Sequence, residues 1–308
     1  MDSIKRPKIF ETNLLFLALS IVLLFIGAMV QSREIYSGLL ITEYILVLLP
    51  NLLYLKLKGI SLKRALRLNK ISFKNIILVI LITIFAYPLV AFINAIFLSI
   101  ISIFREVYPS TVPVPGDDIQ FIYSFFVIAI SPGICEEIMF RGTIMAAYHK
   151  LGPKKSIIIS GLLFGIFHFT ILNFVGPTLL GLLFGVMVYK TNSIYSSIIA
   201  HTLNNGIAIS LLFLLSKYGH VLDSLPSQEG LDPVQAGKSI IIILIIIILC
   251  AFIVFKLIKR LSKPVERYEY DDYIDYGYVD HARSIFDYIP VLISFIIFIY
   301  INWRFVLI

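Results

Sequence analysis

The sequence predicts an all-α fold, a polytopic transmembrane helix bundle. Of the 308 residues, 59% are hydrophobic and only 15% are charged, and the mean hydropathy is +0.93. Soluble domains contain about 45–50% apolar and about 25% charged residues. A soluble fold of this length could not bury so much apolar surface, so soluble, disordered and coiled-coil classes are excluded.

Nine apolar stretches approach the length of about 20 residues that a helix needs to cross a bilayer. The fifth and sixth are short, so the bundle is expected to have 8–9 spans. The third contains Pro88, which predicts a kink or a tilt. The first follows a basic start and is expected to remain as an uncleaved anchor. The nine stretches cover residues 10–31, 36–55, 75–103, 119–140, 156–172, 176–190, 194–216, 239–257 and 285–303.

The distribution of cations predicts a cytoplasmic N-terminus. With nine spans, 21 of the 26 Lys and Arg residues fall on the N-terminal side of the membrane. Cytoplasmic loops of membrane proteins carry such an excess. Topology therefore explains the net charge of +7, and no nucleic-acid partner is expected.

The chain divides into N-terminal membrane spans (1–118), a core (119–216) and C-terminal spans (217–308). Two connecting segments have unusual compositions. The basic segment 56–74 is either a surface helix on the anionic leaflet or a simple loop. The segment 265–280 is rich in tyrosine and acids, which is typical of a solvated linker or of a docking segment for a basic partner.

Ionisable residues inside apolar spans are costly and call for an explanation. Glu137 and Arg141 stand at i and i+4 on the fourth span, the favourable order for an ion pair. Glu136 points about 100° away and is left free of that pair. Pro132-Gly133 is expected to break the helix just before it.

Two further spans carry histidine. Phe164 and His168 share one face of the fifth span, and His201 and Asn205 share one face of the seventh. At ~1.5 Å per residue, Glu136, His168 and His201 fall in one layer of the membrane. The sequence therefore predicts that these polar groups converge in one site.

Two other features are expected to serve packing. Glu43 in the second span has no motif around it, so a packing hydrogen bond is favoured over a role at the site. The pentapeptide GLLFG occurs at 161–165 and again at 181–185, and its paired glycines permit close helix contact.

The convergent residues form a hydrolytic set. Glu136 and His168 can hold and deprotonate a water molecule, and His201 with Asn205 can donate to a developing oxyanion. Alternatively, Glu136, His168 and His201 could bind zinc, with water as the fourth ligand. The signatures HExxH and GxSxG are absent.

The order and spacing of these residues resemble the CAAX protease and bacteriocin-processing family (CPBP, or Abi) of intramembrane endopeptidases, which is similar to type II CAAX prenyl endopeptidases. The resemblance covers about residues 119–216, the core helices of the family. The family motifs EExxxR, FxxxH and HxxxN stand here as Glu136-Glu137-xxx-Arg141, Phe164-xxx-His168 and His201-xxx-Asn205.

The resemblance implies a peptide hydrolase with a cytoplasm-accessible cavity and a peptide or membrane-protein substrate in the lipid bilayer. It assigns water activation to Glu136 and His168, and it assigns the oxyanion to His201 and Asn205. Glu137 and Arg141 would order the site. Both a zinc metalloprotease and a metal-free, glutamate-driven enzyme remain open. The alternative function is a non-catalytic membrane scaffold or a bacteriocin self-immunity protein of the same family.

Overall fold

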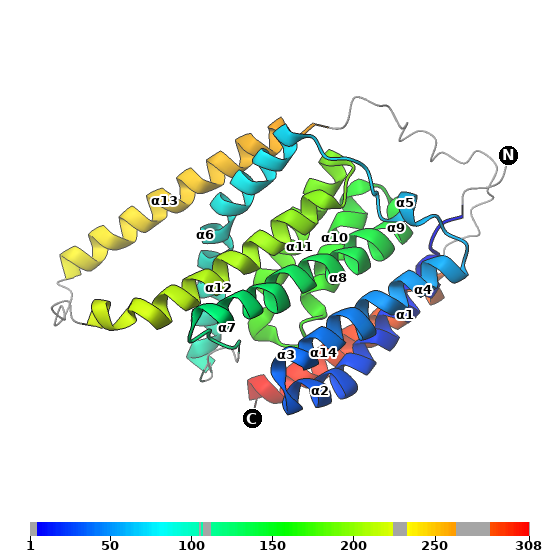
Figure 1. The fold of residues 1–308 in the computed structure, drawn as a ribbon, viewed down its shortest axis with the longest axis horizontal. Coiled ribbons are helices and arrows are strands. Elements are labelled where there is room, and N and C mark those ends of the chain that lie inside the picture. The colour runs from blue at the N-terminus through cyan, green and yellow to red at the C-terminus, as the bar shows by residue number, and fades with distance from the viewer. Residues whose placement is uncertain (1–4, 105, 107–111, 224–232, 263–283, 308) are drawn as a thin grey trace.

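The structure, a computed structural model, describes residues 5–104, 106, 112–223, 233–262 and 284–307 (Figure 1). These residues form helices and no strand, which confirms the predicted all-α class. Eight helices are long and apolar enough to cross a membrane. They are Ile9–Arg33, Ile35–Leu57, Phe73–Phe104, Asp118–Ala147, Ile171–Thr191, Tyr195–Gly219, Gly237–Arg260 and Ile285–Trp303.

The first two spans form a tight helical hairpin. At the turn, the Glu34 carboxylate accepts the backbone N–H groups of Tyr36 and Ser37, which caps the second helix. The Ser37 side chain and these two backbone groups together lower the pKa of Glu34. Gly38 permits the close crossing, because a Cβ there would lie 2.7 Å from the backbone nitrogen of Gln31. The hairpin consists of α1 (Ile9–Val22), η1 (Leu23–Gly27), α2 (Ala28–Arg33), α3 (Ile35–Leu40), η2 (Ile41–Leu48) and α4 (Leu49–Leu57).

The basic segment 56–74 is held against the protein at its far end. It contains the short helix α5 (Leu62–Ala65). Beyond that helix, the Arg67 carbonyl accepts the backbone N–H of Ile194, and Asn69 donates to the Asn192 carbonyl at 2.7 Å. These bonds attach the segment to a connection between two core helices.

The long helix α6 (Phe73–Phe104) runs through Pro88 without ending. It packs along α13 (Pro233–Arg260), and both lie at one side of the bundle in Figure 1. Asn75 at the start of α6 donates to the Ser262 carbonyl at 2.8 Å, which joins the end of α13 to the start of α6.

The fourth span is a continuous helix from Asp118 to Ala147, so the predicted break at Pro132-Gly133 is wrong. A π-helical turn directly precedes the proline, which stands in the first turn of the next α segment. An altered turn of this kind lets a helix absorb a residue that lacks an N–H group. The segments are α7 (Asp118–Ser124), η3 (Phe125–Ile130), α8 (Ser131–Glu137), η4 (Ile138–Ile144) and α9 (Met145–Ala147).

The predicted span 156–172 is shorter than expected. Its helix, α10, covers Pro153–Ile166, only 14 residues, and Phe169 just after it has a left-handed φ of 58°. A short turn, η6 (Ile171–Asn173), leads back into α11 (Val175–Thr191). The α10–α11 pair therefore forms a hairpin with one short arm.

The repeated GLLFG pentapeptides lie where α10 and α11 meet. A Cβ on Gly181 would lie 2.9 Å from the Gly161 Cα, so side chains at both positions are excluded. The predicted packing role of these two glycines is confirmed.

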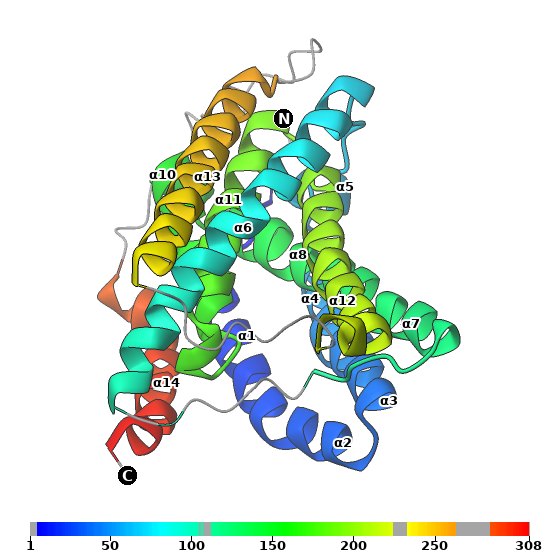
Figure 2. The ribbon, with the colours of Figure 1, turned by 90° about the vertical axis from the view of Figure 1, so that its left-hand side faces the viewer.

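The three sequence motifs lie in the middle of the bundle. Figure 1 shows α8, α11 and α12 (Tyr195–Asp223) at its centre, with the N-terminal hairpin and α14 (Ile289–Leu307) on the side away from α13. Figure 2 gives the perpendicular view. One polar chain joins three elements, since Tyr148 donates to Asn13 and Asn13 donates to the Asp287 carbonyl. The segment 265–280 lies outside the described residues, and the boundaries at 118 and 216 stay predictions.

The polar contacts bring most of the basic segments to one end of the bundle. Burial, together with the nearby charges of Arg67 and Arg6, lowers the pKa of His149, just before α10, to about 4, while the Asn69–Asn192 bond holds the end of α11 beside the same loop. Both ends of the α10–α11 hairpin thus lie at this end. The helices after the α10–α11 hairpin therefore have the same orientation in the membrane whether that hairpin crosses the membrane fully or only partly.

We expect reporter fusions after Lys150, Asn192 and Lys263 to report the same side of the membrane, and a fusion after Ile308 to report the other. The physical reason is the shared basic end, which the cation excess favours for the cytoplasm. A reporter after Asn192 that opposed the one after Lys150 would contradict the hairpin.

Candidate active site

The centre of the site is a fully buried ion pair. Arg141 Nη1 donates to Glu137 Oε1 at 2.8 Å, and both side chains have no exposed surface. The two residues stand one helical turn apart, as the sequence predicts. The described fourth helix continues to Ala147, so Arg141 lies inside the bundle rather than in a loop.

The guanidinium of Arg141 has further partners on α10 and α11. Its Nη2 donates to the Gly181 carbonyl at 2.9 Å, and it lies 4.7 Å from the Phe164 ring centroid and 5.4 Å from that of Phe184. Aromatic faces attract a desolvated cation. A side chain at Gly181 would approach this nitrogen to 3.2 Å, so the glycine leaves room for the arginine.

His201 on α12 shares the Glu137 carboxylate. Its Nδ1 donates to Glu137 Oε1 at 2.9 Å, and its ring stacks on Phe184 with centroids 5.3 Å apart. Because Nδ1 is occupied, the Nε2 atom is the part of the ring that faces the second acid. Glu136 Oε2 lies 3.8 Å from it.

Glu136 differs from its neighbour in having no hydrogen bond to any described residue. Its side chain keeps 12% of its surface exposed, whereas that of Glu137 is fully covered. It lines a cavity of about 400 Å³, and His168 lines the same cavity. The predicted division between a paired and a free glutamate therefore agrees with the geometry.

His168 follows the end of α10, and its backbone contact fixes the state of its ring. Its Nδ1 lies 2.9 Å from the Phe164 carbonyl oxygen. A carbonyl can only accept, so Nδ1 carries the proton. In the neutral ring, Nε2 is then unprotonated and free to accept a proton.

Gly133 explains how α8 and α12 approach closely enough to join Glu137 with His201. A Cβ on Gly133 would lie 3.1 Å from the backbone nitrogen of Thr202 and would overlap its hydroxyl group. Thr202 directly follows His201, so a larger residue at 133 would separate the two motifs. The sequence suggested a helix break here, but the glycine instead serves a helix contact.

Asn205 lies one turn after His201 and has a partner that the sequence did not predict. Its Nδ2 donates to the Ile128 carbonyl at 3.1 Å. In a regular helix that carbonyl would accept the N–H of residue 132, and Pro132 has none. Asn205 thus satisfies the carbonyl that the proline leaves free, and its role at an oxyanion stays a prediction.

The expectation for Glu43 is wrong. Its side chain is buried on η2, but Oε2 makes no hydrogen bond with any described residue. Instead, Glu43 lines the same cavity as Glu136 and His168. Packing of η2 against α8 brings it there, a contact between distant segments that no local motif signals.

The proposed zinc ligands do not fit a metal centre in this arrangement. Among the described residues, no three His, Cys, Asp or Glu side chains lie close enough together to hold one ion. The Nδ1 atoms of His201 and His168 are hydrogen-bonded, which leaves Nε2 of each ring as the nitrogen that could reach an ion, and the side chains as placed do not bring both of these atoms together with a carboxylate. We therefore derive no step through zinc.

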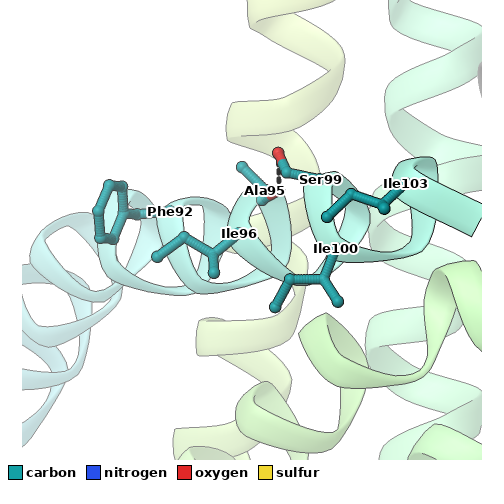
Figure 3. Close-up of a pocket in the computed structure, with 6 residues that line it drawn as sticks. All are labelled: Phe92, Ala95, Ile96, Ser99, Ile100 and Ile103. Atoms are coloured by element: carbon teal, nitrogen blue, oxygen red, sulfur yellow. Dashed lines mark hydrogen bonds between the residues drawn. The ribbon is translucent and has the colours of Figure 1, made fainter.

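A second cavity lacks the ionisable residues that line the cavity of Glu136. It has a volume of about 380 Å³ and lies along α6, where Figure 3 shows its lining side chains on one face of a single helix. Its one hydroxyl, on Ser99, donates to the Ala95 carbonyl. With no ionisable lining residue it has no means of acid–base chemistry, so the candidate site is the cavity of Glu136.

The fold and this site define a multi-pass membrane protein with a buried glutamate–histidine centre. Residues 118–207 match the family model described as type II CAAX prenyl endopeptidase Rce1-like. The match covers all six predicted site residues and confirms the resemblance to the CAAX protease family. No curated protein and no solved structure matches the chain significantly.

The ion pair should control stability more than Glu136 does. Replacing Arg141 by Ala leaves Glu137 buried without its cation, which should lower the free energy of unfolding by about 3–5 kcal/mol. Glu136→Gln keeps the shape of a partly exposed group and should cost under about 1 kcal/mol. Denaturation in detergent measures both, and the reverse order would contradict the assignment.

The Asn205–Pro132 relation can be tested with a double-mutant cycle. Asn205→Ala orphans the Ile128 carbonyl and should cost about 1–3 kcal/mol of stability. In a Pro132→Ala background the new N–H can bond that carbonyl, so the same change should cost at least about 1 kcal/mol less. Additive losses in the unfolding measurements would show that the two residues are independent.

Proposed function

We propose that the protein is an intramembrane endopeptidase in which Glu136 and His168 activate water. The observation that carries the proposal is the cavity, which is lined by a glutamate without a hydrogen-bond partner and by a histidine with a free Nε2. A catalytic base must lie within hydrogen-bonding reach of the proton that it removes, and its accepting atom must not already be hydrogen-bonded to another group. Among the seven named residues of the three motifs, only these two line the cavity.

In the proposed first step, Glu136 accepts a proton from a water molecule that His168 Nε2 helps to hold. The water oxygen forms a bond to the carbonyl carbon of the scissile peptide, and the carbonyl oxygen takes the negative charge. A tetrahedral intermediate results. Groups already oriented toward that oxygen lower the barrier, because they need no rearrangement during the reaction.

His201 is the proposed donor to this oxyanion. Its Nδ1 is bound to Glu137, so a protonated ring presents Nε2–H toward the side where Glu136 lies. Because Nδ1 already donates to Glu137, this role requires the ring to carry a second proton on Nε2. In this arrangement two carboxylates are balanced by one guanidinium and one imidazolium, which suits a site surrounded by apolar helices.

In the second step the carbon–nitrogen bond breaks, and the proton held by Glu136 passes to the leaving nitrogen. The products are a carboxylic acid and an amine, and Glu136 returns to its ionised form. Asn205 is proposed to be a positioning residue. Its side-chain amide donates to the Ile128 carbonyl and thereby keeps α12 packed against η3. The substrate class is a peptide, and the largely apolar cavity wall favours an apolar segment.

Activity tests the proposal directly. Glu136→Gln and His168→Ala should each lower the rate of peptide hydrolysis by at least ~10²-fold, the usual effect of losing an acid–base group. Purified protein in nanodiscs would be incubated with a random-sequence peptide mixture, and mass spectrometry would count cleaved products. Glu11→Gln and His149→Gln, which lie outside the cavity, are the matched controls. Wild-type protein that produced no cleavage would favour the scaffold or immunity alternative.

Metal analysis separates the two mechanisms. With the metal-free mechanism, active protein should hold no stoichiometric zinc, and a chelator should leave its rate unchanged. One tightly held zinc per chain, lost together with activity and with His201→Ala, would overturn the glutamate-driven mechanism.

A further inference from the structure

The cavity extends beyond the motif residues to the N-terminal hairpin. Glu136 and His168 line one part of it, and η1 and η2 supply another part through Leu23, Leu24 and Glu43. The hairpin lies outside the segment 118–207 that matches the family model. The part of the cavity that the hairpin forms therefore lies outside the family match, and its lining must be interpreted from the residues of this chain.

Glu43 is the one ionisable group that the described hairpin contributes to this cavity. Its residue surface is only 5% exposed, and Oε2 is buried without a hydrogen bond. A buried polar atom without a partner costs about 1–3 kcal/mol, and more when it is charged. A packing role alone would not offset this loss of free energy.

The neighbouring polar groups do not supply the missing partner. Gln31 Nε2 donates to Thr42 Oγ1 at 3.0 Å, and Thr42 in turn donates to the Gly38 carbonyl at 2.7 Å. No Lys or Arg lines the cavity. Arg141, the nearest cation of the site, is engaged by Glu137 and Gly181. None of the described residues therefore gives Glu43 a hydrogen-bond partner, and the cavity that it lines is open to a group that would.

The backbone at Glu43 is also unusual. It stands in an eight-residue π-helical segment, Ile41–Leu48, that packs against α8, the helix of the two motif glutamates. Such segments are rare in proteins and occur frequently at functional sites, because the wider turn re-aims a side chain. The same kind of segment holds Arg141, in η4.

We propose that Glu43 is a substrate-binding residue, whose carboxyl oxygen accepts a hydrogen bond from an N–H group of a peptide bound in the cavity beside Glu136. The donor is a backbone amide or a lysine ammonium of that peptide. The inference rests on the proposed peptide substrate but not on catalysis, so binding can test it separately from cleavage.

The binding test uses full-length Glu136→Gln protein in nanodiscs, which cannot cleave its ligand under the proposed mechanism. The probe is a short fluorescent Leu/Ala peptide with one central lysine, together with a twin that carries norleucine instead. Adding Glu43→Leu should weaken binding about 10-fold, the effect of one lost hydrogen bond to a buried carboxyl. Adding Glu43→Gln, which can still accept, should restore much of the affinity for the backbone-bound mode.

The two peptides distinguish the donor. Equal weakening for both identifies a backbone amide, and weakening for the lysine peptide alone identifies the ammonium. Either result supports the proposal. Unchanged affinity of the Glu43→Leu protein for both peptides would overturn it, and so would a parent Glu136→Gln protein that bound neither peptide.

A stability measurement separates binding from a structural role. Glu43→Leu removes an unpartnered buried carboxyl, so its Tm in detergent should equal or exceed that of the parent. The control Glu11→Leu removes an acid that accepts from Lys58 and should not raise Tm. A Glu43→Leu protein with a lower Tm and normal peptide affinity would assign Glu43 to packing. If cleavage fails in wild-type protein while the Glu43-dependent binding holds, only the proposed function is overturned.

Discussion

The carboxylate of Glu137 is the interaction on which the site depends. It accepts from Arg141 on its own helix and from His201 on α12, and all three side chains are buried. In an apolar bundle each of these charges or dipoles would be costly alone, so they stabilise one another only as a set. Arg141 extends the set to α11 through the Gly181 carbonyl. One acid thereby fixes three helices, and the adjacent acid, Glu136, is left free to face the cavity.

The helix backbones had to be altered to allow this arrangement. Gly133 lets α12 approach the fourth span, and Gly161 and Gly181 let α10 approach α11. Pro132 removes a backbone donor, and the Asn205 side chain supplies another for the freed carbonyl of Ile128. Small residues and an exchanged hydrogen bond are the usual means of close packing in a membrane, where every backbone polar group needs an internal partner. The motif asparagine thus has a structural reason to be present that is independent of any contact with substrate.

The N-terminal hairpin completes the cavity rather than merely anchoring the chain. Its π-helical segment η2 packs on α8 and places Glu43 opposite the motif residues, where the carboxyl has no partner within the described protein. A stable fold retains such a group at a cost in free energy. Costs of this kind concentrate at functional sites, because binding requires groups that the protein leaves unsatisfied.

The sequence by itself determined the class of the protein and most of its spans, and it predicted six residues of the candidate site. Apolar run length and cation placement are local properties, and the Glu137–Arg141 pair lies within one helical turn, so both can be predicted from spacing. Only the tertiary structure decided that the helix passes Pro132 unbroken, that α10 stops at Ile166, that His201 shares Glu137, and that Glu43 faces the cavity. The last two depend on contacts between helices far apart in the chain, and such contacts leave no periodic signal in the sequence.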